Sequence, residues 1–79
     1  MDFNQRKADT LEYFSRREWV RPAQYAIDSR FHPIRASYSY LLHLHRMGYL
    51  VTGDDATGHR VYKLSRRGAS WLLRFTKQE

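Results

Sequence analysis

The chain contains no cysteine among its 79 residues. Small secreted domains usually depend on disulfides, so this absence favours the interior of a cell, and we expect a cytoplasmic protein. No uninterrupted apolar run approaches the roughly 20 residues that are needed to cross a bilayer, so no membrane partner is expected. The first seven residues also lack the apolar stretch of a secretory signal.

Signatures of catalysis and of cofactor binding are missing as well. The sequence has no phosphate-cradling glycine loop, and its one close pair of carboxylates is the adjacent Asp54 and Asp55. His43 and His45 are two residues apart, so on a helix they point about 200° away from each other and cannot bind one metal ion. His32 and His59 have no matching ligand spacing. We therefore expect no enzyme activity, no metal site and no cofactor.

Acidic residues are scarce in most of the chain. The protein carries fourteen Lys and Arg against eight Asp and Glu, a formal net charge of +6, and eleven of the basic residues are Arg. Between Ser29 and Gln78 the only acids are Asp54 and Asp55. Arginine suits both phosphate groups and guanine edges, so this distribution favours a nucleic-acid partner. A basic, solvated surface with no partner is the alternative.

The periodicity predicts one α+β domain over residues 1–79. Three helices are expected at residues 4–16, 22–31 and 33 or 34–47, with a brief strand or connector at Trp19 and Val20. Pro22 can begin the second helix, and Gly48 can end the third. The inward positions are expected to be Ala23, Ala26 and Ile27 in the second helix, and Ser37, Leu41 and Leu44, with Ile34 and Tyr40, in the third.

A β-hairpin and a last helix are expected after Gly48. Residues 49–52 and 59–64 are rich in β-formers, and the turn residues 53–58 lie between them. Tyr62 and Leu64 should share one face of the second strand, with Val61 and Lys63 on the other. Ser65 can then cap a final helix that turns Gly68 inward.

Two short motifs resemble the winged helix-turn-helix superfamily, in particular small prokaryotic regulators of the MarR, ArsR or PadR kind. The first is Leu41-x-x-Leu44-x-x-x-Gly48-Tyr49-Leu50, at the end of the third helix. The second is Val61-Tyr62-Lys63-Leu64-Ser65-Arg66-Arg67-Gly68, which leaves the hairpin. The resemblance covers about residues 5–76. It implies a three-helix core, a two-stranded wing and a C-terminal helix.

The resemblance also implies that the third helix enters the major groove of double-stranded DNA in a transcriptional regulator. The positions that would contact bases or phosphates are Arg21, Gln24, Arg35, Tyr38, Ser39, His43, Arg46, Arg60 and Lys63. Most contacts in such complexes go to phosphates, which favours Arg and Lys.

The acidic residues at the tip of the hairpin depart from this family pattern. Asp54 and Asp55 stand where many members are basic, and two carboxylates would be repelled by the minor groove. They could instead orient Arg60 or face a protein partner. A protein-docking module within a larger assembly is therefore the alternative function, which exposed Tyr38 and Leu42 also favour. A homodimer stays open, through Trp71, Leu73 or Phe3, and so does RNA in place of DNA.

Overall fold

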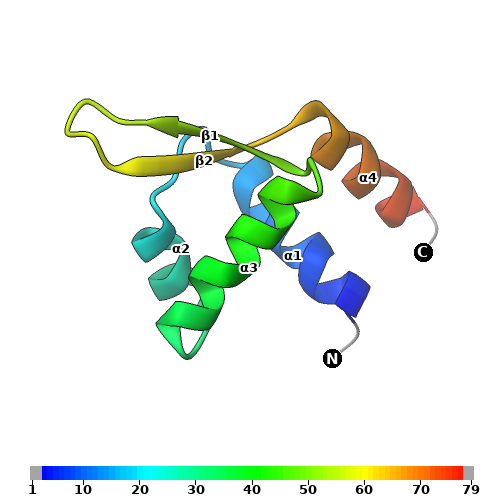
Figure 1. Cartoon of the computed structure of the whole chain (residues 1–79). Coiled ribbons are helices and arrows are strands. Elements are labelled where there is room, and N and C mark those ends of the chain that lie inside the picture. The colour runs from blue at the N-terminus through cyan, green and yellow to red at the C-terminus, as the bar shows by residue number, and fades with distance from the viewer. Residues whose placement is uncertain (1–2, 78–79) are drawn as a thin grey trace.

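A computed structural model of the chain describes residues 3–77, which form an α+β fold of four helices and one two-stranded antiparallel sheet (Figure 1). The elements are α1 (Phe3–Ser15), α2 (Pro22–Ser29), α3 (Ile34–Arg46), β1 (Leu50–Asp54), β2 (Arg60–Leu64) and α4 (Arg66–Lys77). The order and type of these elements confirm the prediction. None of the helices in this part of the chain is long and apolar enough to cross a membrane.

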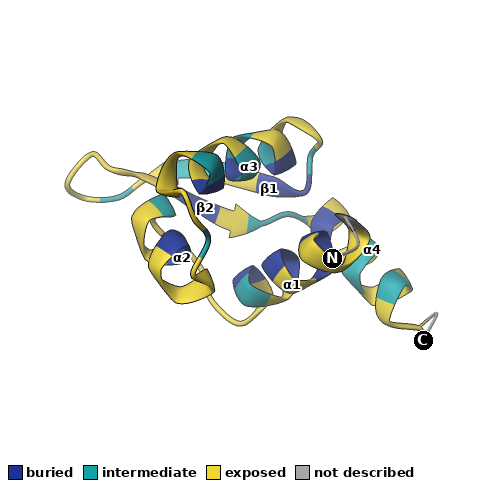
Figure 2. Cartoon of the chain, turned by 90° about the horizontal axis from the view of Figure 1, so that it is seen from below, coloured by how far each residue is buried: buried dark blue, intermediate teal, exposed yellow. Residues whose placement is uncertain are grey.

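The core lies where α1, α2 and α3 meet the hairpin, and their buried residues face one another there (Figure 2). Leu11 and Phe14 of α1 and Leu41 and Leu44 of α3 have no exposed surface. Burying a side chain of this size stabilises the fold by about 1.5–3 kcal/mol. Ser37 is also fully buried, so the three main inward positions predicted for α3 are confirmed.

The predicted inner face of α2 is wrong at two of three positions. Ala26 is buried as expected, but Ala23 is exposed and Ile27 is 67% exposed. The buried neighbour of Ala26 is Tyr25, whose ring stacks on Phe14 with 5.7 Å between the centroids. Residues two apart on a helix point in nearly opposite directions, so burying Tyr25 leaves Ile27 outside.

The turn between α2 and α3 begins earlier than predicted. Arg30 adopts a left-handed conformation (φ 54°), and its N–H and that of Phe31 bond to carbonyls of the last turn of α2. This closure ends α2 at Ser29 and not at Phe31.

Two further inward positions were predicted in α3, and one of them is wrong. Ile34 is 49% exposed, whereas Tyr40 packs partly buried against the core.

The hairpin pairs Leu50 with Leu64 at one end and Asp54 with Arg60 at the other. β1 therefore continues through two residues that were predicted to belong to the turn. The predicted short strand is present as a bridge, in which Val20 and Tyr62 exchange two backbone hydrogen bonds of 2.9 Å. Val61 is buried, whereas Lys63 on the same strand face is exposed. The Trp19 indole lies over Gly53, the cross-strand partner of Val61.

Polar contacts at Ser65 and Lys7 connect α4 to the rest of the fold. The Ser65 hydroxyl accepts a hydrogen bond from the Gly68 N–H (2.9 Å), which confirms the predicted cap, and it donates one to the Gly48 carbonyl (2.6 Å). Lys7 of α1 is buried with its ammonium 4.7 Å from the ring centroids of both Tyr49 and Trp71. α4 lies at the opposite end of the molecule from the hairpin loop (Figure 1).

Candidate nucleic-acid interface

The exposed face of α3 carries a line of polar and basic side chains. Arg35, Ser39, His43 and Arg46 are all exposed, and their spacings of three or four residues place them on one face of the helix. At 1.5 Å per residue, the two arginines lie about 17 Å apart along the helix axis. No residue of α3 is acidic, so this face has no carboxylate of its own to repel a polyanion.

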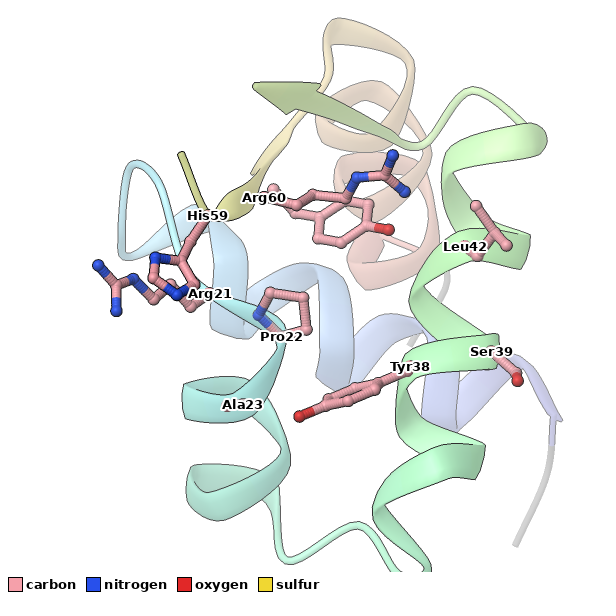
Figure 3. Close-up of a pocket in the computed structure, with 9 residues that line it drawn as sticks. Arg21, Pro22, Ala23, Tyr38, Ser39, Leu42, His59 and Arg60 are labelled. Atoms are coloured by element: carbon pink, nitrogen blue, oxygen red, sulfur yellow. The ribbon is translucent and has the colours of Figure 1, made fainter. Parts of the chain in front are cut away.

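A groove of about 590 Å³ lies beside this face, between the start of α2, α3 and β2 (Figure 3). It is lined by Arg21, Pro22, Ala23, Tyr38, Ser39, Leu42, His59, Arg60 and Tyr62. The Tyr38 ring points across the groove from α3 toward α2 (Figure 3). No carboxylate is among the lining residues. The groove therefore combines an apolar wall with two arginines, Arg21 just before α2 and Arg60 of the hairpin.

The loop at the tip of the hairpin is organised by the Asp55 carboxylate. Its Oδ1 accepts hydrogen bonds from the Thr57 hydroxyl (2.7 Å), the Thr57 N–H (2.9 Å) and the His59 N–H (3.0 Å). Its Oδ2 binds Arg21. The Thr57 hydroxyl first, and then these amides and the guanidinium, hold the pKa of Asp55 well below its usual value despite partial desolvation. The carboxylate is therefore ionised at neutral pH.

For Asp55, this arrangement corrects the prediction that the hairpin acids orient Arg60. Asp55 pairs with Arg21, at the entrance to α2, with 2.6 Å between Nη2 and Oδ2. Asp54 faces Arg60 across the hairpin as its backbone partner. The sequence could not reveal the partner of Asp55, because Arg21 is 34 residues away and only the folded hairpin brings it close.

The nine predicted contact residues fall into three groups. Four line the groove: Arg21, Tyr38, Ser39 and Arg60. Three more, Arg35, His43 and Arg46, continue the exposed face of α3. Two lie apart from both: the Gln24 side chain donates to Asp28 (2.8 Å), and Lys63 lies on the other face of β2, with its ammonium 5.7 Å from the Trp19 ring centroid.

Sequence reasoning missed most of the groove's apolar wall. Pro22 was predicted only to begin the second helix and Ala23 to face inward from it, and Tyr62 was predicted only to share a strand face with Leu64. Leu42 was predicted to be exposed on the third helix, where it favoured the protein-docking function, and the structure places it partly buried in the groove wall. An apolar residue on that polar face was the one available signal, since the groove itself depends on how the hairpin is placed against α2 and α3.

The histidines do not converge on a site. Within residues 3–77 no group of three or more His, Cys, Asp or Glu side chains could hold a metal ion. The His45 ring lies 3.0 Å from the Leu50 carbonyl oxygen and packs edge-on to Tyr62, whereas His43 is on the exposed face of α3.

Comparisons of the chain with protein families, curated proteins and solved structures find no match. The functional proposal therefore comes from the geometry and charge of this interface.

Proposed function

We propose that the chain is a winged helix-turn-helix domain that binds double-stranded DNA as a transcriptional regulator. In this proposal α2 and α3 form the helix-turn-helix, α3 is the recognition helix, and the β1–β2 hairpin is the wing. The observation that carries the proposal is the exposed face of α3, with Arg35 and Arg46 at its two ends, no carboxylate along it, and Arg60 beside it across the groove.

The dimensions and chemistry of this face suit the major groove. That groove is about 12 Å wide and admits one helix. Arg35, Ser39 and His43 can then donate to base edges, and Tyr38 lies beside them at the groove wall. Arg46 and Arg60 supply positive charge for phosphates on either side, because phosphate contacts make up most of such an interface.

A protein-docking module is the second candidate function. The groove wall formed by Pro22, Ala23, Tyr38 and Leu42 is apolar enough to accept a protein side chain, and this observation favours docking. Winged helices serve both purposes, so the fold does not decide between them. The two functions differ in their response to salt.

A titration of fluorescently labelled 20-base-pair duplex DNA, followed by anisotropy, tests the proposal. We expect mixed-sequence DNA to bind with a dissociation constant of roughly 10⁻⁴–10⁻⁶ M near physiological salt. With about three to five phosphate contacts, log K should fall with log salt at a slope of about −3 to −4.5. A single-stranded oligonucleotide of the same length is the control and should bind more weakly. No binding at about 50 mM salt would contradict the proposal and favour the docking function.

A further inference from the structure

We propose that the Asp55 carboxylate is a built-in competitor for Arg21, which it withholds from DNA phosphates and thereby lowers the affinity for DNA. This inference rests on the proposed DNA-binding function. It assigns the acidic tip of the hairpin a role within that function, where the family pattern would place basic residues.

The Arg21 side chain is held by two residues of the hairpin loop, Asp55 and Thr57. Its Nε donates to Asp55 Oδ2 at 2.8 Å, and its Nη2 donates to the Thr57 hydroxyl at 3.1 Å. Nη2 also lies 2.6 Å from Oδ2 in the ion pair. Carboxylate and phosphate oxygens accept the same donors from a guanidinium. The carboxylate therefore occupies the edge of the guanidinium that carries Nε and Nη2, one of the edges on which a phosphate could bind.

The position of Arg21 makes this competition relevant to DNA. Arg21 immediately precedes Pro22, the first residue of α2, and it lines the groove beside the exposed face of α3. Its side chain is 49% exposed, so a phosphate at this surface can reach it. A duplex held against α3 would bring its backbone past this entrance to α2.

The two oxygens of Asp55 have separate roles, which allows a clean substitution. Oδ1 accepts the three hydrogen bonds that organise the loop, and Oδ2 binds only Arg21 among the contacts described above. In Asp55→Asn, the amide oxygen can keep the loop contacts. The amide NH₂ group then stands at the Oδ2 position and cannot accept from Arg21.

The test compares Asp55→Asn, Arg21→Ala and the double variant by anisotropy over a range of salt. We expect Asp55→Asn to bind duplex DNA about 3- to 10-fold more tightly, with a salt slope steeper by about one, as for one added phosphate contact. Arg21→Ala alone should change the affinity less than about 2-fold, and in the Asp55→Asn background it should remove most of the gain. Asp54→Asn is the matched control, because it removes the same charge from the neighbouring residue, and its effect should not depend on Arg21.

Three outcomes would overturn the inference while leaving DNA binding intact. Asp55→Asn could bind no more tightly than the wild type. Its gain could persist without Arg21, which would assign it to simple repulsion of phosphates. Arg21→Ala alone could weaken binding as much as Arg46→Ala, which would make Arg21 a direct contact, and this result does not require Asp55→Asn to fold. Absence of wild-type binding at about 50 mM salt overturns the proposed function and this inference together.

Discussion

Replacing Arg35 and Arg46 together with alanine should lower the affinity for duplex DNA roughly 30-fold or more at moderate salt. The two guanidinium groups stand at opposite ends of the exposed face of α3. An arginine that pairs with a guanine edge contributes about 1–3 kcal/mol, and one that contacts a phosphate contributes about one unit of salt slope. Anisotropy titrations at several salt concentrations would measure both quantities in one series.

The matched control for this variant removes two charges from the other end of the molecule. Arg74 and Lys77 are exposed on α4, away from the groove and the hairpin loop (Figure 1). Arg74→Ala combined with Lys77→Ala should therefore weaken binding less than about 3-fold, through the long-range field alone. Equal losses in the two double variants would assign DNA binding to overall charge and would remove the special role of α3.

Gly68→Ala should destabilise the fold by about 2 kcal/mol, although alanine is the better helix former by about 1 kcal/mol. Gly68 is buried in the first turn of α4, and an added Cβ would overlap the Tyr49 carbonyl oxygen and come within 2.8 Å of a Leu64 methyl carbon. Backbone cannot move aside as a flexible side chain does. The melting temperature should fall by roughly 8–16 °C for a domain of this size.

Ser70→Ala provides the control for Gly68, because Ser70 is exposed on the same helix two residues later. That variant should melt within about 2–3 °C of the wild type, as substitutions at an exposed helical position usually do. A Gly68→Ala protein that is as stable as the wild type would show that α4 does not pack this closely on the Tyr49 backbone.

The order of elements was predictable because short-range chemistry determines it. Pro22 begins α2, the positive φ of Gly48 (86°) ends the turn after α3, and Ser65 caps α4. The predictions that were wrong concern which residues are buried, and burial depends on packing between elements. Tyr25 displaced Ile27 from the core because a large ring with a partnered hydroxyl fills the space beside Phe14, and single-helix periodicity cannot show this.

The candidate site was also predictable only in part. The exposed face of α3 followed from the predicted burial of Ser37, Leu41 and Leu44, since a helix with a known inner face has a known outer one. The groove and the pairing of Arg21 with Asp55 did not follow. Both depend on where the hairpin lies relative to α2. A small residue such as Ala23 gives no sign in the sequence that it lines a groove.

The measurement that tests the DNA-binding account most directly is an NMR titration of unlabelled duplex DNA into ¹⁵N-labelled protein. The account predicts that amide shifts concentrate on α3 between Arg35 and Arg46 and at Arg60, while the second half of α4, residues 72–77, stays unchanged. Shifts centred on α4, or the same small change at every exposed basic residue, would contradict it.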